Sequence, residues 1–567
     1  MKRYICYALL LQLLLLGTAT ATELDALDVM FREVQRSMKV LKRHDEAPYY
    51  ISYEITEDVA ATVSGAFGKA TSRNFIVSRY LDIDLRLGDY SLDNTHPLRG
   101  GLSELSNGPA TTPIEDEEAL RTTLWLHTDV AYKQALTQFT RVKSAVQSSV
   151  RPVFRVGDYS PYPVRKFSEA KVELDADFEH WRDKIQQYTE PFSEAEFIQD
   201  NYAYIFGDVE TRWFVNSDGS RILVSKPYYR LVIQATTKAD DGMEISLERT
   251  FDASTPNKIL QDEQVMSAVR SMIEDLHALR VAPLVEPYTG PAILSGRSTG
   301  VFFHEVLGHR VEGHRQRLLD EGQTFHSQLN QRLLPRSFSV VFDPTEGSFD
   351  GVELIGGYKY DNQGVEAQRV VVVDRGTLKG FLMSKTPIMG FYRSNGHGRK
   401  NYGYPVVSRQ SNLFVEIRNP HTRDELEAML IERIKEQGKP YGLYFADVKG
   451  GFTLTARSMP NAFNVNPLMV YRLYPDGSKE LVRGVDLIGT PLTTFSRVEA
   501  GADDYEVFND VCDAESGQLP VSTVAPSILI SQIEVQKTES SRSIPPILPS
   551  PVSRIDGHSG SRADSER

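Results

Sequence analysis

The chain has 567 residues, of which 41% are hydrophobic and 25% are charged, as in ordinary soluble globular proteins. This length exceeds what one hydrophobic core usually supports, so two or three domains are expected. The formal net charge of −13 argues against nucleic-acid binding, because phosphate recognition needs a basic surface.

The first 21 residues have the three parts of a secretory signal peptide. Lys2 and Arg3 supply the positive start, residues 5–17 are apolar, and residues 19–21 (Ala-Thr-Ala) form a small-residue cleavage signal. The apolar run is shorter than the about 20 residues that span a bilayer, although an uncleaved anchor is the alternative. We therefore expect an exported protein, periplasmic or secreted, without stable membrane insertion.

Hydrophobic periodicity predicts an N-terminal α+β domain over residues 22–282. Apolar residues spaced three and four apart predict helices, and two-residue alternation predicts strands. The predicted helices cover residues 23–43, 116–146, 163–188 and 257–279, and the predicted strands cover 80–87, 202–225 and 229–236. A loop is expected at 91–113, and Asn216-Ser217-Asp218-Gly219 predicts a turn within the longest strand segment.

A second domain is expected over residues 283–537, after prolines that mark a boundary. It is predicted to be a mostly antiparallel β domain that carries one short helix at its start, which makes the fold class α+β. The predicted strands are 339–342, 367–373, 413–417, 451–455, 468–473 and 528–535, with a helix at 423–437. Residues 538–567 are rich in Ser, Pro, Arg and Gly, which predicts a disordered tail.

The helix expected after the boundary carries His304-Glu305-Val306-Leu307-Gly308-His309. Two imidazoles can bind zinc, and the carboxylate beside the first can take a proton from a zinc-bound water. The common His-Glu-x-x-His motif spaces its histidines four apart, whereas these are five apart. Five residues turn an α-helix by about 500°, which leaves the rings roughly 140° apart. We therefore expect either a locally distorted helix, such as a π-bulge eased by Gly308, or no metal site.

A catalytic zinc ion also needs a third protein ligand. Glu312, His314 and His326 are the local candidates, and Cys512 is the distant one. If Cys6 leaves with a signal peptide, Cys512 has no disulfide partner, which is unusual in an exported protein. A zinc thiolate would explain both the incomplete histidine pair and the single Cys, while a buried inert Cys and one half of an intermolecular disulfide are the alternatives.

The motif and several later segments resemble the TldD/PmbA family of metalloproteases. The resemblance rests on residues 288–296, 304–313, 376–382, 395–399, 405, 409–412, 511–512 and 517–521. In that family a motif-bearing TldD-type subunit pairs with a TldE/PmbA-type subunit that lacks the motif. The resemblance implies that His304, His309 and Cys512 bind Zn2+ and that Glu305 is the catalytic carboxylate. It also implies that unfolded peptides are cleaved inside a homodimer or a heterodimer with a TldE/PmbA-like paralogue.

The Gly-rich loop around His397 and Arg399 supplies two candidate catalytic donors to the reacting oxyanion, with ordinary loop structure as the alternative. Exposed strand edges in the β domain could bind an extended peptide by strand addition. Two other functions stay open. A non-catalytic peptide-binding subunit with a structural metal would usually need four protein ligands. An exported structural or adhesion protein would explain neither Glu305 nor Cys512.

Overall fold

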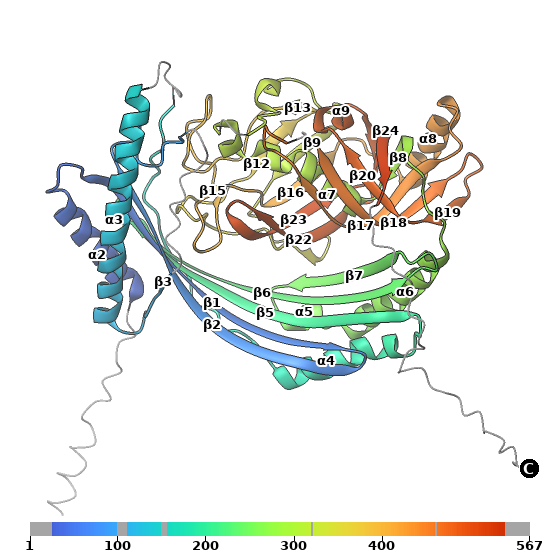
Figure 1. Cartoon of the computed structure of the whole chain (residues 1–567), viewed down its shortest axis with the longest axis horizontal. Coiled ribbons are helices and arrows are strands. Elements are labelled where there is room, and N and C mark those ends of the chain that lie inside the picture. Colours follow the sequence, from blue (N-terminus) through green and yellow to red (C-terminus); the bar gives the residue numbers. More distant parts are fainter. Residues whose placement is uncertain (1–24, 99–109, 149–155, 319–320, 460–461, 539–567) are drawn as a thin grey trace, which may run out of the picture.

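The structure is a computed structural model that describes residues 25–98, 110–148, 156–318, 321–459 and 462–538. The expected signal peptide lies outside the described residues, as does the expected tail beyond residue 538. Two β-rich halves lie against each other, and the long curved strands of the first half pass beneath the second (Figure 1).

A curved seven-stranded sheet forms the first half. Its order is β3 (Ala110–Thr111), β2 (Lys69–Leu87), β1 (Pro48–Ala66), β5 (Ile198–Asn216), β6 (Arg221–Lys238) and β4 (Lys166–Ser168), with β7 (Glu244–Ala253) also on β6. The long strands are antiparallel, and only β4 joins its neighbour in parallel. The predicted turn at 216–219 joins β5 to β6. The end of the segment expected at 202–225 and the strand expected at 229–236 together form the continuous strand β6.

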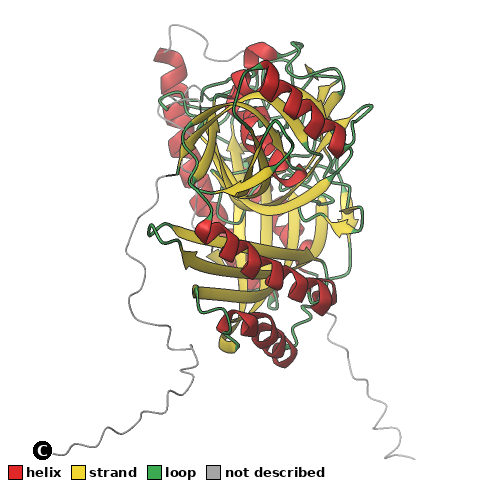
Figure 2. Cartoon of the chain, turned by 90° about the vertical axis from the view of Figure 1, so that its right-hand side faces the viewer, coloured by secondary structure: helices red, strands yellow, loops and turns green. Residues whose placement is uncertain are grey.

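Five helices pack on one face of this sheet. One end is covered by α2 (Ala26–Leu41) and α3 (Glu117–Ser148), and the other by α4 (Phe178–Thr189), α5 (Pro256–Ile259) and α6 (Asp262–Val281). A short 3₁₀ turn, η1 (Glu190–Ser193), follows α4. Helices lie against the strands of the lower sheet in the turned view (Figure 2). The predicted helices at 23–43, 116–146 and 257–279 are confirmed over the described residues, the last with a break before Asp262.

The predicted helix at 163–188 is wrong over its first half. The chain is extended up to Asp177, whose side chain caps the start of α4. The backbone N–H groups of Val172 and Asp175 donate to side-chain oxygens of β6, at 3.0 and 2.8 Å. Bonding to the sheet replaces the hydrogen bonds that a helix would have made, and Val172, Leu174 and Ala176 alternate with the two-residue period of an extended chain.

Two further sheets build the second half. The six-stranded sheet has the order β13 (Thr377–Leu378), β12 (Val370–Asp374), β9 (Phe338–Phe342), β16 (Asn412–Ile417), β23 (Gly517–Ala525) and β22 (Glu506–Ala514). The seven-stranded sheet has the order β17 (Gly442–Thr453), β8 (Tyr288–Leu294), β24 (Ile528–Lys537), β20 (Val485–Gly489), β18 (Phe463–Leu473) and β19 (Lys479–Val482), with β21 (Val498–Gly501) also on β24. Two short hairpins are β10 (Ser348–Phe349) with β11 (Val352–Glu353), and β14 (Gly398–Arg399) with β15 (Val407–Ser408).

Helix α7 (Gly296–Val306) lies between the two sheets and contacts β17, β22 and β23. Its apolar side chains, including Phe302 and Phe303, are buried in the largest hydrophobic core. The other helices of this half are α8 (Arg423–Glu436) and α9 (Pro491–Phe495), with 3₁₀ turns η2 (Gly308–Val311), η3 (Gly313–Gln316) and η4 (His326–Gln328). Most strand pairs are antiparallel, which confirms the expected α+β class with a mostly antiparallel second half. No helix of the described segments is long and apolar enough to cross a membrane.

Charged side chains join the two halves across the helix-free face of the first sheet. Lys400 pairs with Glu54 at 2.9 Å and with Asp82 at 2.5 Å. Arg212 and Lys226 each donate, at 2.6 Å, to backbone carbonyls of the second half. These buried contacts hold the sheet against the domain that carries the motif.

Candidate metal centre

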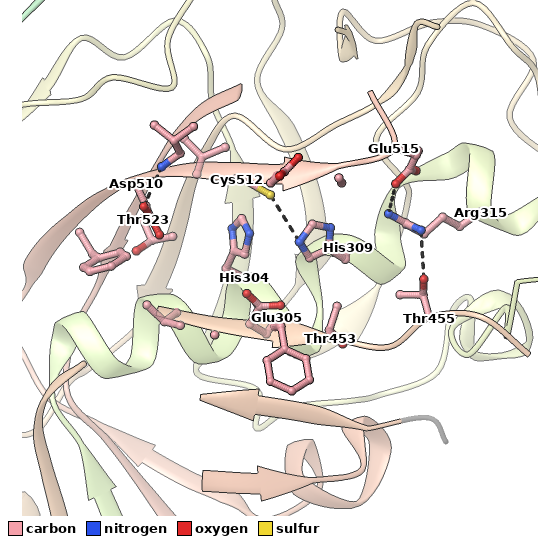
Figure 3. Close-up of a pocket in the computed structure, with 18 residues that line it drawn as sticks. His304, Glu305, His309, Arg315, Thr453, Thr455, Asp510, Cys512, Glu515 and Thr523 are labelled. Carbon is pink, nitrogen blue, oxygen red and sulfur yellow. Dashed lines mark hydrogen bonds and ion pairs between the residues drawn. The ribbon is translucent and has the colours of Figure 1, made fainter. Parts of the chain in front are cut away.

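Three side chains with metal-ligating atoms meet where α7 ends. His304 lies in the last turn of α7, His309 in η2, and Cys512 on β22. Their ligand atoms all lie within 4.8 Å of one another, and His309 Nε2 is 3.5 Å from Cys512 Sγ. Figure 3 shows the three side chains pointing toward one another. The ligand set predicted from the sequence is therefore brought together by the fold.

The fold accommodates the five-residue spacing by ending the helix, so the expected π-bulge is wrong. Helix α7 ends at Val306, Leu307 follows as its C-cap with φ −108° and ψ −52°, and a 3₁₀ turn begins at Gly308. The two imidazole rings finish with centroids 4.8 Å apart and planes at 88°. Because His309 no longer belongs to the helix of His304, the angular objection to a shared metal does not apply.

Gly308 is required for a different reason from the one expected. A Cβ atom at this position would lie 1.9 Å from Gln410 Oε1. That close approach brings Gln410 Nε2 to 3.4 Å from both His304 Nε2 and the His304 carbonyl oxygen. Gly308 therefore makes room for a side chain that helps to position the first ligand.

Glu312 supports His309. Its Oε2 atom lies 3.3 Å from His309 Nδ1, which leaves His309 Nε2 to face Cys512. Arg315 Nε donates to the same carboxylate at 2.9 Å, and Arg409 Nε lies 3.4 Å from its other oxygen. Burial alone would raise the pKa of Glu312, but His309 and the two arginines outweigh it and hold that pKa at about 2. A carboxylate behind a histidine is the usual support of a metal ligand.

Cys512 is buried in surroundings that favour its thiolate form. Burial alone would raise the pKa of the thiol, but His309 and His304 outweigh burial and hold that pKa well below its usual range. Arg409 adds a hydrogen bond to Sγ at 3.3 Å. Since the thiolate is the form that binds metal, the site is prepared for a cation.

Glu305 is buried beside the ligands and has a free acceptor. Its Oε2 atom has no hydrogen-bond partner among the described residues. Burial raises its pKa, although His304 and His309 act in the opposite direction. Gly451 of β17 lies against it, since a Cβ atom there would be 2.9 Å from Glu305 Cγ. The carboxylate therefore faces the site with proton-accepting capacity that no neighbour uses.

These residues line a cavity of about 510 Å³ between β17 and β22. Strand β17 pairs with β8 only at Leu443–Phe445, and β22 pairs only with β23, so each strand has a free edge among the described residues. The three ligands lie at the middle of the cavity, with Asp510 and Thr523 toward one end and Arg315 and Glu515 toward the other (Figure 3). The site is thus an open groove flanked by two strand edges.

His397 and Arg399, expected to donate to the oxyanion, do not line this cavity. His397 is fully buried, with Nε2 3.1 Å from Ser411 Oγ, and burial lowers its pKa to about 3. Arg399 donates to the backbone oxygens of Gln410 and Pro520. Both side chains hold buried loops together, so their place in the structure disfavours direct contact with a reacting group.

A second group of possible ligands lies next to the first. Oxygen or nitrogen atoms of Glu312, His314 and Glu515 lie within 4.8 Å of one another. Arg315 already occupies this group, because it donates to Glu312 at 2.9 Å and to Glu515 at 2.8 Å. The fourth candidate from the sequence, His326, is exposed and does not line the cavity.

Sequence reasoning missed the residues that support the site. Arg315 carried no pattern that linked it to the motif, and Gln410 lay within the resembling segment 409–412 without an indicated role. Gly450 and Gly451 did carry a signal, because consecutive glycines within a strand often mark a close approach of the backbone to another group.

The second half of the chain matches a known family of domains. Residues 287–537 match the PmbA/TldA metallopeptidase C-terminal domain. A metalloprotease of Methanothermobacter thermautotrophicus is 26% identical over 328 residues, which cover 57% of this chain and 67% of the relative. A zinc metalloprotease TldD homologue of Saccharolobus solfataricus is 24% identical over 248 residues, which cover 43% of this chain and 51% of the relative. These matches span about half to two thirds of the relatives' own length.

The fold has a counterpart among solved structures. TldE from Thermococcus kodakarensis superposes with a TM-score of 0.59 at 13% sequence identity. The superposition covers 90% of this chain and all of that one. At this identity the likeness concerns the fold alone.

Proposed function

We propose that this chain, whose residues 287–537 match the PmbA/TldA metallopeptidase C-terminal domain, is a zinc metallopeptidase acting on unfolded peptides. The observation that carries the proposal is the arrangement of His304, His309 and Cys512 around one point, with the free carboxylate of Glu305 beside them.

The donor set fits zinc. Two imidazole nitrogens and a thiolate are ligands that Zn2+ favours, and Glu312 supports one imidazole as the surroundings of zinc sites commonly do. Only three such ligands meet here among the described residues, which leaves a coordination position for water or substrate. A structural zinc site would usually be closed by a fourth protein ligand, so the arrangement favours catalysis over a purely structural metal.

A bound zinc ion supplies Lewis acidity to a water molecule and to the carbonyl of the substrate. Glu305 Oε2 is placed to accept the proton of that water and to return it to the leaving amine. Burial strengthens its affinity for the proton, since it raises the pKa of this carboxyl group. Gly451 keeps β17 close to Glu305 and so limits the carboxylate to the groove.

The strand edges of the groove suit an extended peptide. A substrate strand that adds to the free edge of β17 or β22 would gain backbone hydrogen bonds without a particular sequence. Phe452 of β17 lines the groove with 52% of its surface exposed, which offers apolar contact to a substrate side chain. Most strands of a folded protein are already paired on both edges, so an unfolded peptide fits between these strand edges more readily.

Location and assembly form part of the same proposal. The signal-peptide pattern of the first 21 residues supports export to the periplasm or beyond. N-terminal sequencing of the purified protein tests this, and a chain that begins at Met1 would contradict cleavage. The resemblance of the motif segments to the TldD/PmbA family, in which a TldD-type subunit pairs with a TldE/PmbA-type subunit, supports a dimer, formed either with a second copy or with a TldE/PmbA-like paralogue.

The decisive experiment is Glu305→Gln in the full chain. It should retain zinc and lose about 10²–10⁴-fold in cleavage of an unstructured peptide, because the general base is removed. Glu432→Gln, an exposed position on α8, is the matched control and should keep full activity. Unchanged cleavage by Glu305→Gln would reject the mechanism. Wild-type protein with bound zinc but no cleavage would support a peptide-binding subunit with a structural metal, and the absence of zinc would reject the site.

A further inference from the structure

An outer edge of the first sheet carries exposed apolar residues. β2 pairs with β1 along its length, while on its other side β3 pairs only with Tyr80 and Leu81. Up to Arg79, this side of β2 has no strand partner among the described residues. Phe75, Ile76 and Val77 are 54%, 49% and 50% exposed there. In Figure 1 β2 forms the outer border of the curved strands.

This edge lacks the features that usually protect free strands. Proline, strong local charge and bulges discourage pairing between chains. From Ser72 to Arg86, β2 has no proline and no register shift against β1. Arg79 is already paired with Glu57 and Glu115, so its charge is largely neutralised. The edge is therefore ready to accept another strand.

The apolar residues occupy both faces of the strand. Because side chains alternate, Phe75 and Val77 lie on one face and Ile76 on the other. Helix α4 covers only the first face, where the Phe75 and Phe178 rings have centroids 6.5 Å apart. A neighbouring strand would cover both faces at once, whereas a helix or loop would cover one.

The substrate does not explain this edge, since no residue of β2 lines the metal-site groove. A second copy of the chain does. When a strand pairs with the same strand of a second copy about a two-fold axis, the pairing is antiparallel. The numbers of two directly opposed residues then always add up to the same value. With the axis at Ile76, Phe75 of each copy opposes Val77 of the other, and Ile76 opposes itself. Aromatic and β-branched residues are favourable partners across antiparallel strands.

The ends of the free segment agree with this register. It opposes Asn74 to Ser78 and Arg73 to Arg79, and Arg79 is neutralised by its two acidic partners. The next position would be Tyr80, where β3 already occupies the edge. The free stretch therefore ends where the pairing must end.

We propose that β2 joins the same strand of a second copy, antiparallel about Ile76, so that one sheet continues through a homodimer. The inference rests on the assembly proposed above and specifies its interface. It does not depend on catalysis, because its test measures mass and covalent linkage.

Cysteine pairs test the register. Opposed residues of antiparallel strands have Cα atoms about 4.5–5.5 Å apart, within the reach of a disulfide. Under mild oxidation Ile76→Cys should form a covalent dimer. Asn74→Cys and Ser78→Cys should each stay uncrosslinked alone, because each faces its own copy about 13 Å away. The double variant Asn74→Cys with Ser78→Cys should crosslink. The natural Cys512 is buried and serves as the background in every sample.

Native mass measurement completes the test. The wild-type chain should have twice the mass of one chain, and Ile76→Lys should have the mass of one chain while retaining zinc and the wild-type melting temperature. Ile76 is half exposed, so the substitution does not disturb the core. A monomeric wild-type protein, pairing only with a TldE/PmbA-like paralogue, or crosslinking by Asn74→Cys alone would overturn the proposal. Loss of cleavage in Glu305→Gln is unaffected by any of these outcomes.

Discussion

Two adjacent groups of side chains in this protein hold metal-ligating atoms at similar spacing, yet only one suits a metal. His304, His309 and Cys512 have their ligand atoms within 4.8 Å, as do Glu312, His314 and Glu515. In the second group a guanidinium, Arg315, already bonds both carboxylates. In the first, the guanidinium contact among the described residues is one hydrogen bond from Arg409 to the thiol.

The difference shows that the cation already in place decides what a cluster can bind. Two carboxylates that are neutralised by an arginine have little affinity left for a metal, because the metal would have to displace that charge. The first group instead has a thiolate and two imidazoles. Gln410 contacts the ring of His304 and Glu312 contacts the ring of His309, and these contacts orient the two imidazoles. The second group stabilises the first, since Glu312 belongs to it and also supports His309.

The largest expected effect comes from removing a ligand of the first group. Cys512→Ser should weaken zinc binding by more than about 1,000-fold, because each of three ligands carries a large share of a binding free energy of roughly 10–16 kcal/mol. Metal analysis with a competing chelator measures this, and His326→Ala, an exposed candidate, should bind zinc as the wild type does. Full zinc occupancy in Cys512→Ser would remove the thiolate from the site.

The second-largest effect is expected from removing Arg315, the cation that pairs with the carboxylates of the second group. Arg315→Met leaves Glu312 and Glu515 without their partner and should lower the free energy of unfolding by about 3 kcal/mol. The loss is expected at the low end of the range that is usual when one partner of a buried ion pair is removed, because Glu515 is 29% exposed. Denaturant titration measures the loss, and Arg315→Lys should lose less because it keeps the charge. A second equivalent of tightly bound metal in the wild type would contradict the comparison.

Glu312 links the two groups and should show an intermediate effect. Glu312→Gln removes the charge behind His309 and should reduce zinc affinity by about 10–100-fold, as expected for the second layer of a metal site. The same chelator competition measures it. An affinity equal to that of the wild type would show that His309 is oriented without this carboxylate.

His314 should have the smallest effect. His314→Gln removes one contact to Glu515 and should change the free energy of unfolding by about 1 kcal/mol, with zinc affinity unchanged. Thermal unfolding and metal analysis of the same samples separate the two quantities. Loss of zinc in this variant would make His314 a ligand and would merge the two groups into one.

The ligands could be predicted because their residue types themselves indicate metal binding. A His-Glu pair followed by a second His, together with a Cys that has no disulfide partner among the described residues, leaves few alternatives for Cys512. Helix α8 was predictable for a similar reason, since Thr422 and Glu425 form a capping box at its start. In these cases the signal lies within a few neighbouring residues or in an unusual residue type.

The incorrect predictions concern features that distant contacts decide. The end of α7 at Val306 is matched to Gln410, which approaches Gly308 from another segment. The extended chain before Asp177 depends on hydrogen-bond acceptors of β6. A Gly-rich loop does not reveal whether it is exposed, and His397 proved to be fully buried. The local periodicity of the sequence does not indicate contacts between distant segments.

The candidate ligands His309 and Cys512 are synthesised at different times. Cys512 follows His309 by 203 residues, and β22 must pair with β23 before the thiol faces the histidines. A ribosome therefore completes almost the whole second half before three ligands exist together. During synthesis a partial chain that ends before Cys512 lacks one of the three candidate ligands, so the candidate site is incomplete until β22 has been made. The order of the ligands along the chain thus couples completion of the candidate site to completion of the second half.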